Sequence, residues 1–388
     1  MRILYHHRTQ AEDGQAVHVR ALLRAFAALG HEVLEVGLVR HGSAAPAARG
    51  TSWRLVARLP RFLRELAEYG YNGIGRRRVV GAAARFDPAF LYERYAFGNV
   101  SGVLAARRLG RPLMLEVNSP LALELSRTRG LSFPGVAQRV ERFVWQGADR
   151  VCAVSGVLRD LLVAEGVEPG RVAVIRNGVD LERYAYPDRP AARAAARAEL
   201  GLAPAGEGEL VVGFVGYYRP WHRLDLAIAA LAAPELAGVR LVLVGEGPAR
   251  EELAAAAAAR GLGPRVTFAG ARPHARIPAL LPAFDVALLP AINAYASPLK
   301  LQEYMAAGLP AIAPDQPNLR EIVRPGENGI LVPPGDGDAL AAAILALAGD
   351  AGRRVRLGAA ARRTIEEEGC TWLGNARRVV EIMEELVR

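Results

Sequence analysis

The stretch "ELVVGFVGYYRPWHRLDLAIAALAAPELAGVRLVLVGEGP", residues 209–248, contains the strand–helix–strand pattern that repeats along the sequence. A short apolar run at residues 209–218 is followed by an amphipathic helical pattern and then by a second apolar run at residues 239–247. Continuous apolar runs of this length are typical of strands that are buried on both faces. A helix between two such strands favours a parallel pairing, with the helix covering one face of the sheet.

The same alternation extends in both directions and predicts an α/β fold with parallel sheets covered on both faces. The pattern pauses at residues 181–209, which we expect to form a hinge with one charged helix. The count therefore favours two sheets of about six strands each. Because open α/β sheets bind ligands beyond the carboxyl ends of their strands, we expect the chemistry there. The other runs with strand character are residues 1–7, 31–39, 89–95, 112–118, 149–156 and 171–180, and then 265–270, 285–292, 309–314 and 329–335.

The 388 residues, 51% of them hydrophobic, suffice for two or three globular domains with large cores. No apolar run approaches the ~20 residues of a membrane span, and the N-terminus has no signal-peptide core. The two cysteines, Cys152 and Cys370, have no metal-binding spacing, and we expect small core residues in a reducing cytoplasm. The expected location is the cytoplasm, with peripheral contact at the inner face of the membrane as a further expectation.

The formal net charge is +9, and much of it is concentrated in residues 49–80. This stretch holds eight arginines against Glu65 and Glu68, a local net charge of +6, and Pro60 interrupts its helical pattern. Two interpretations stay open: a solvated helical hairpin, or a surface for anionic lipid or a phosphorylated acceptor. We expect no nucleic-acid partner, because no recognition motif accompanies the charge. The arginines are Arg49, Arg54, Arg58, Arg61, Arg64, Arg76, Arg77 and Arg78.

The stretch "SPLKLQEYMAAGLP" has the features of a helix start but carries an unfavourable charge. Ser297 is a good N-cap and the next proline a good first helical residue, but Lys300 puts a cation where the helix dipole favours an anion. An anion bound by Lys300 and by the free N–H groups of Leu299 and Lys300 would remove this conflict. Glu303 could accept hydrogen bonds from both hydroxyls of a ribose. The pair predicts a nucleoside diphosphate, and a solvated Lys300 is the alternative.

A glycine-containing loop follows the first predicted strand, in "EDGQAVHVRALLRAF". Gly14 has no Cβ close to the start of the next helix, and such a loop suits a diphosphate. His18 lies inside that helix. It is either a phosphate contact or a residue packed in a helix interface.

Two further strand ends carry candidate residues. In "FVGYYRPWHRLDLAIAAL", Arg219 can pair bidentately with a phosphate, and His222 either adds a donor or is a turn residue. "LVLVGEGPAREEL" has Gly245 but Arg250 in place of the third glycine of a dinucleotide fingerprint, which favours a tight turn lining a nucleotide crevice. Asp336 and Asp338 have the spacing of a metal motif, but Asp338 is better explained as an N-cap, so we expect no metal.

Successive blocks of this sequence resemble the retaining glycosyltransferases of family GT4, which have the GT-B fold of two facing Rossmann-like domains. The resemblance covers essentially the whole chain. It implies an acceptor-binding domain at residues 1–180, a domain at residues 181–371 that binds a nucleotide-sugar donor, and a final helix, 372–388, that returns to the first domain. The blocks are "DGQAVHVRALLRAFAALGHEV", "ADRVCAVSGVLRDLL", "VIRNGVD", "VGFVGYYRPWH", "LVLVGEGP", "VTFAGARPHARIPALLPAFDVALLP" and "SPLKLQEYMAAGLPAIA".

The resemblance also implies roles for single residues. It makes Glu303 the ribose carboxylate, gives the diphosphate to Lys300 and nearby amides, and places Arg272 and Pro273 near the base and His18 and Gly14 near the phosphates. The sequence departs from the family pattern at Tyr295, where a glutamate is common, at Tyr217 and His222, where arginine and lysine are usual, and at Asn118, where many members have histidine. The predicted catalytic residues are Lys300, Arg219, His18 and Asn118, and the predicted donor-binding residues are Gly14, His222, Gly245, Arg272, Pro273, Tyr295, Ser297, Leu299, Lys300 and Glu303.

The predicted function is transfer of a hexose-type sugar from a nucleoside-diphosphate sugar to an acceptor hydroxyl with retention of configuration and without a metal or cofactor. No pair of carboxylates stands out for a double displacement, which fits the front-face route proposed for the family. UDP- and GDP-sugars are the favoured donors, and the acceptor is a glycan, a glycolipid or other lipid-linked sugar, or a small metabolite. The alternatives are a nucleotide-sugar epimerase on the same fold and a non-catalytic sugar-nucleotide-binding subunit.

Overall fold

The computed structural model describes residues 1–10, 14–39, 59–204 and 209–387, and the chain divides into two compact units. The first unit comprises Met1–Asn177, Tyr295–Ser297 and Trp372–Arg388, and the second comprises Gly178–Ala294 and Pro298–Thr371. The first boundary therefore follows Asn177 rather than residue 180, and a tripeptide from the middle of the second half belongs to the first unit.

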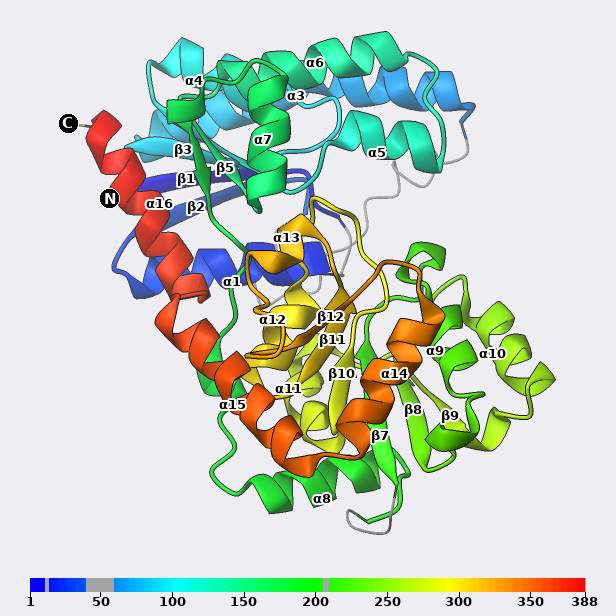
Figure 1. The fold of residues 1–388 in the computed structure, drawn as a ribbon. Helices are drawn as coiled ribbons and strands as arrows, with labels where there is room; N and C mark the ends of the chain where they lie inside the picture. The colour runs from blue at the N-terminus through cyan, green and yellow to red at the C-terminus, as the bar shows by residue number, and fades with distance from the viewer. Residues whose placement is uncertain (11–13, 40–58, 205–208, 388) are drawn as a thin grey trace. The chain divides into compact units, whose positions relative to one another are not determined.

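The first unit is built on a six-stranded parallel sheet with the strand order β2-β1-β3-β4-β5-β6 (Figure 1). Its central strands read as unbroken apolar runs because both of their faces are covered, and β4 is buried at every position. The strands are β1 (Arg2–His7), β2 (Glu32–Gly37), β3 (Phe90–Arg94), β4 (Leu113–Val117), β5 (Arg150–Ala153) and β6 (Val172–Val174).

Helices cover both faces of this first sheet. On one face Leu4 of β1 packs in a core with Val79 and Val103, and on the other Phe26 and Tyr5 contact the ring of Tyr92. The last helix, α16, packs on α1, which confirms the predicted return of the chain to the first unit. The helices are α1 (Gly14–Ala28), α3 (Arg61–Phe86), α4 (Ser101–Leu109), α5 (Leu121–Thr128), α6 (Pro134–Gly147), α7 (Gly156–Ala164) and α16 (Trp372–Val387).

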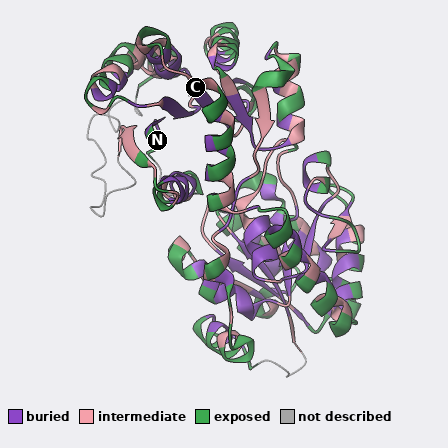
Figure 2. Cartoon of the chain, turned by 90° about the vertical axis from the view of Figure 1, so that its left-hand side faces the viewer, coloured by how far each residue is buried: buried purple, intermediate pink, exposed green. Residues whose placement is uncertain are grey.

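The second unit contains another six-stranded parallel sheet, with the order β12-β11-β10-β7-β8-β9. Alternate residues of β7 enter two different cores, with Val211 and Val215 on one face and Val212 and Phe214 on the other. Figure 2 shows the strands of this unit as mostly buried. The strands are β7 (Leu210–Val215), β8 (Val239–Val244), β9 (Val266–Gly270), β10 (Val286–Leu288), β11 (Ala311–Pro314) and β12 (Ile330–Val332).

Helices also cover both faces of the second sheet. Residues of α8, α11, α12 and α15 share one core, and residues of α9, α10 and α14 share the other. The helices are α8 (Arg189–Glu199), α9 (Leu224–Ala230), α10 (Arg250–Ala259), α11 (Ile277–Leu280), α12 (Leu299–Ala306), α13 (Pro317–Arg320), α14 (Gly337–Ala348) and α15 (Ala351–Glu367).

The structure confirms the α/β class and the two sheets of six strands, and every predicted strand is present. Residues 181–209 contain the predicted charged helix, α8, and Ala196 and Leu200 pack α8 and its end into a core of the second unit. One local prediction was wrong. Asp336, not Asp338, caps α14, since its side chain accepts a hydrogen bond from the amide of Ala339. Both cysteines are buried, as expected.

Candidate functional site

The strongest candidate group surrounds Lys300 at the carboxyl ends of the strands of the second sheet. Lys300 lies in the first turn of α12, and its ammonium is 4.3 Å from the centre of the Phe214 ring and 3.3 Å from Nε2 of His222. Phe214 belongs to β7, and His222 ends the short 3₁₀ turn Pro220–His222 that follows this strand. Lys300 is the only lysine in the sequence, whose other basic side chains apart from the histidines are all arginines.

Glycines leave the space that the lysine occupies. A Cβ added to Gly216, directly after β7, would lie 2.8 Å from Nζ of Lys300. A Cβ on Gly245, directly after β8, would lie 2.0 Å from the carbonyl oxygen of Gly216. Both glycines have a φ of +147°, which side chains disfavour. The two strand ends can therefore approach each other and the lysine only because both positions are glycine, as the tight turn predicted at Gly245 requires.

The surroundings of Lys300 make it a weak base. Burial lowers the pKa of its ammonium to about 7, although the charge of Glu303 acts in the opposite direction. Burial and the nearby Lys300 charge lower the pKa of His222 to about 3, so this imidazole is neutral at neutral pH. With Nδ1 2.9 Å from the carbonyl of Tyr217, His222 donates there and accepts from Lys300 at Nε2. His222 thus holds the ammonium in place instead of presenting its own N–H at this point.

Glu303 follows one turn later and is buried. Its carboxylate lies 2.5 Å from Nε2 of His274, which follows Arg272 and Pro273 after β9. The hydroxyl of the next residue, Tyr304, accepts a hydrogen bond from the amide of Val215 at 2.8 Å. This bond ties the body of α12, which carries Lys300 and Glu303, to the end of β7.

The remaining predicted residues of the second unit lie at neighbouring strand ends. The guanidinium of Arg219 is stacked on the rings of Tyr217 and Trp221, at 4.5 and 5.2 Å from their centres. Arg219 is exposed, and among the described residues its contacts are these two rings rather than a carboxylate. Arg272 is half-buried, and Pro273 is exposed beside it.

The structure contradicts the predicted N-cap role of Ser297, while donor binding by Ser297 and Tyr295 stays a prediction. The residue before α12 is Pro298, and no side chain caps the helix, so Ser297 is not the N-cap. Ser297 instead accepts two hydrogen bonds from Asn177: from its amide through Oγ at 3.2 Å and from its Nδ2 through the carbonyl at 2.6 Å. The hydroxyl of Tyr295 donates to Glu124 at 3.2 Å, within the first unit. Leu299 begins α12.

The first unit has a separate polar cluster centred on Glu116 of β4. Nε2 of His18 lies 2.9 Å from Glu116 and Nδ1 lies 3.0 Å from Oδ1 of Asn177, so both ring nitrogens face oxygen atoms. Burial alone would raise the pKa of Glu116, but His18 and Arg94 outweigh it and hold this pKa far below its usual value. The predicted residue Asn118 also donates to Glu116.

His18 also contacts α16, because its ring meets that of Trp372 edge-on at 4.7 Å. His18 is therefore packed in a helix interface, and its contact with a phosphate stays a prediction. Gly14 begins α1, the helix that holds His18. Sequence reasoning missed Glu116, Asn177 and His274, which are recognisable only through contacts between segments far apart in the sequence. Sequence reasoning also overlooked that Lys300 is the only lysine in the sequence.

Two negative findings apply to the part of the chain that the structure describes. It contains no group of three or more histidine, cysteine, aspartate or glutamate side chains placed to hold a metal ion. Among its helices, none combines the length and the apolar character needed to cross a bilayer.

The two Rossmann-like units make up the GT-B fold, and the sequence matches glycosyltransferase families in both of them. The family described as "Glycosyltransferase Family 4" matches residues 13–183, and the one described as "Glycosyl transferases group 1" matches residues 203–364. The chain belongs to glycosyltransferase family 4, and it is a glycosyltransferase.

Curated relatives agree with this assignment. A D-inositol 3-phosphate glycosyltransferase of Rhodococcus jostii is 32% identical over 78% of this chain and 68% of its own length. Another of that name, from Thermobispora bispora, is 31% identical over 90% of this chain and 80% of its own length. A GDP-mannose-dependent alpha-mannosyltransferase of Mycobacterium tuberculosis is 30% identical over 68% of this chain and 65% of its own length.

Solved structures share the fold at lower sequence identity. Anabaena Alr3699/HepE in complex with UDP has a TM-score of 0.77 and 22% identity, with 99% of this chain and 100% of that chain covered. The sucrose-phosphate synthase of Thermosynechococcus elongatus has a TM-score of 0.74 and 23% identity, with 100% and 99% covered.

The single lysine makes its titration directly measurable. Reductive methylation with ¹³C-formaldehyde labels only the N-terminal amine and Lys300, so the carbon signal of Lys300 can be followed against pH by NMR. We expect it to titrate near pH 7 in the folded protein and near the ordinary value of about 10.4 in denaturant, because burial disfavours the charged form. Loss of the signal in Lys300→Arg would assign it. A folded-state titration above pH 9.5 (about one unit below the free value) would contradict the burial argument.

Proposed function

We propose that the chain is a retaining glycosyltransferase that moves a hexose-type sugar from a nucleoside-diphosphate sugar to an acceptor hydroxyl. The observation that carries the proposal is the lone lysine in the first turn of α12, held by a neutral histidine. In the proposal the second unit binds the donor and the first unit binds the acceptor.

Several contacts support donor binding by the second unit. The ammonium of Lys300 and the first amides of α12, those of Leu299 and Lys300, all favour an anion at the same point, which suits the diphosphate. The carboxylate of Glu303, one turn later, is the proposed ribose acceptor. The proposed neighbours of the base are Arg272 and Pro273. They follow β9 and directly precede His274, which contacts Glu303.

The proposed reaction breaks the bond between the anomeric carbon and the diphosphate oxygen and forms a bond from that carbon to the acceptor oxygen on the same face. The acceptor proton moves to a phosphate oxygen of the leaving group. Charge grows on the diphosphate as its bond breaks, and Lys300, together with Arg219, stabilises it. A preorganised donor of this kind is worth about 3–4 kcal/mol, and this neutralisation requires no metal ion.

The names of the relatives guide the choice of substrates. We propose a UDP- or GDP-sugar as the donor, because the matched structures include complexes with UDP and UDP-glucose and one relative is named as GDP-mannose-dependent. The proposed acceptor is a glycan, a glycolipid or other lipid-linked sugar, or a small metabolite. Peripheral contact with an anionic membrane would bring the protein to a lipid-linked acceptor.

A donor screen followed by product analysis tests the proposal. We expect one of the UDP-, GDP-, ADP- and TDP-sugars to raise the thermal unfolding midpoint, and the proton coupling at the anomeric carbon of the product to show the donor's configuration, with or without EDTA. Conversion of the donor to another sugar nucleotide without acceptor would identify an epimerase. Binding without turnover across a broad acceptor panel would identify a non-catalytic subunit.

Donor binding should be coupled to proton uptake. Near pH 7 and above, part of Lys300 is uncharged in the free protein, and a bound diphosphate would recharge it. Affinity should be constant below pH 7 and should fall by up to about ten-fold per pH unit above it, since each binding event then takes up a proton. Calorimetry near pH 8 (roughly one unit above this pKa), in two buffers that differ in ionisation enthalpy, measures that uptake with a nucleotide sugar, whose phosphates do not titrate there.

Lys300→Arg is the matched variant for this measurement, because arginine stays charged across the range. It should show no proton uptake from this position, and it should also lose turnover by about 10²-fold or more, since the enclosed space fits an ammonium. Equal proton uptake by the wild type and Lys300→Arg would remove Lys300 from the diphosphate site.

The role of Glu303 can be separated from its contact with His274. If the carboxylate binds the ribose hydroxyls, the wild type should bind a 2′-deoxyribonucleotide about ten-fold or more weakly than the ribonucleotide, and Glu303→Gln should lose most of this discrimination. Glu235→Gln, which changes an exposed carboxylate of the same unit, should behave as the wild type. Undiminished discrimination in Glu303→Gln would show that Glu303 only orients His274.

A further inference from the structure

Helix α3 exposes large apolar side chains on the side opposite the core. Its buried positions include Val79, Ala82 and Ala83. Phe62, Leu66 and Ile74 are 46%, 50% and 56% exposed. Their spacings of four and eight residues place them on one stripe of the helix. Scattered exposed apolar residues need no explanation, but a stripe of aromatic and branched side chains indicates a binding surface.

The acidic and basic side chains of α3 differ in the same way, since the acids contact the first unit and most of the arginines are exposed. Its two acids are both used by the first unit: Glu65 is 5% exposed and accepts from the amides of Ser132 and Phe133, and Glu68 pairs with Arg8 at 2.5 Å. The helix has six arginines, and five of them are exposed. Its outer side is therefore both apolar and cationic. The six are Arg61, Arg64, Arg76, Arg77, Arg78 and Arg85.

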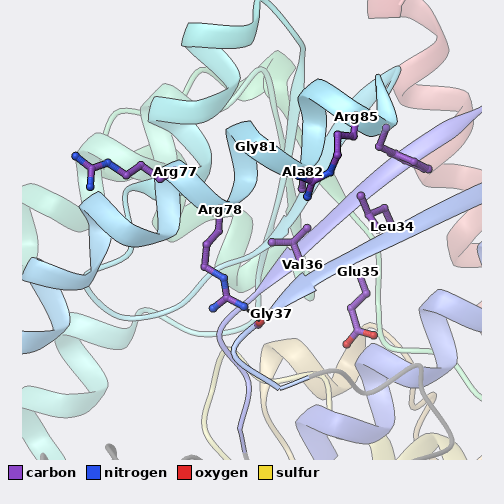
Figure 3. A pocket seen from close by; sticks show the side chains of 10 residues that line it. Leu34, Glu35, Val36, Gly37, Arg77, Arg78, Gly81, Ala82 and Arg85 are labelled. Carbon is purple, nitrogen blue, oxygen red and sulfur yellow. Dashed lines mark hydrogen bonds between the residues drawn. The ribbon is translucent and has the colours of Figure 1, made fainter.

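A pocket of about 620 Å³ adjoins this helix, between α3 and the edge strand β2. Figure 3 shows Arg78 and Arg85 extending from α3 towards the strand, while Arg77 points away from it. Leu34, Val36, Ala82 and Phe86 form the apolar part of the lining. Arg78 donates to the carbonyl of Gly37 at 3.1 Å, so the side chain spans the pocket. The recess offers guanidinium groups above an apolar floor, which suits a phosphate group attached to a hydrocarbon.

We propose that the outer side of α3, with the adjoining pocket, docks the protein on an anionic lipid bilayer. In this arrangement Phe62, Leu66 and Ile74 enter the interfacial region, and the arginines contact lipid phosphates. The part of the predicted stretch 49–80 that holds Arg49, Arg54 and Arg58 lies outside the described residues and is not used here. The proposal is independent of the transferase chemistry, since docking requires neither donor nor turnover.

The combination of side chains selects a bilayer over other partners. Amphipathic helices that lie in membrane interfaces pair arginine-rich polar sides with phenylalanine and leucine. A nucleic acid would contact only the arginines, and the apolar stripe would stay exposed to water. An acidic protein partner would match the charge, but the pocket, with guanidinium groups over apolar side chains, fits a lipid phosphate directly.

Flotation of the full-length protein with vesicles tests the proposal. We expect binding to phosphatidylcholine vesicles that contain phosphatidylglycerol, little binding to phosphatidylcholine alone, and weaker binding at high salt. Arg76→Gln/Arg77→Gln should weaken partitioning by about five-fold per arginine removed. Phe62→Ser/Leu66→Ser should weaken it by about ten-fold or more, because less apolar surface enters the interface.

Matched controls lie on α15 of the second unit. Val355 is 72% exposed, and Val355→Ser and Arg356→Gln should bind vesicles as the wild type does. Circular dichroism and the thermal midpoint verify that each variant is folded, and the nucleotide thermal shift should be the same in all of them. Absence of wild-type binding to anionic vesicles would overturn the proposal, as would equal losses in the α3 and α15 variants. A dimer in solution that Phe62→Ser dissociates would assign the surface to a second copy of the chain instead.

Discussion

The candidate site of the second unit depends on keeping one amino group in a crowded space of low polarity. Lys300 is enclosed by the Phe214 ring, the His222 imidazole and the two glycine strand ends. An arginine there would be too large and could not shed its charge, because its pKa stays above about 12. A lysine can be uncharged while the space is empty and charged when an anion arrives. This difference accounts for one lysine in a chain that otherwise uses arginine.

The first unit solves the problem of a buried charge in the opposite way. Glu116 is buried and stays ionised because Arg94, His18, Tyr92 and Asn118 all donate to it. A buried carboxylate with this many donors is satisfied and needs no ligand. The same cluster reaches Asn177, which binds the segment Tyr295–Ser297 that precedes α12. The charge of Glu116 therefore has a positioning role within the first unit, because it holds His18, which contacts Asn177.

The fold followed from the sequence because parallel strands buried on both faces are continuous apolar runs, and all of them were predicted. The sequence singled out Lys300 because its charge opposes the helix dipole, and its role in binding stays a prediction. The sequence did not indicate contacts that depend on a distant partner. His18 and Asn177 are 159 residues apart, and no local pattern distinguishes Ser297 as an N-cap from Ser297 as an acceptor for Asn177. The exposed apolar stripe of α3 could be predicted only in part. The spacing of its residues is visible in the sequence, but the contacts of Glu65 and Glu68 with other parts of the first unit are not.

Comparison of these charged groups gives a criterion for locating ligands. Glu116 and Glu65 are buried with donors already in place, so a ligand there would have to replace existing hydrogen bonds. Lys300 is enclosed without a carboxylate within ion-pair distance among the described residues, and its histidine partner is neutral. An anion at Lys300 would supply a missing charge and displace no ion pair. This difference is the reason that the diphosphate is proposed at Lys300, where a lysine, unlike an arginine, can lose its charge while no anion is bound.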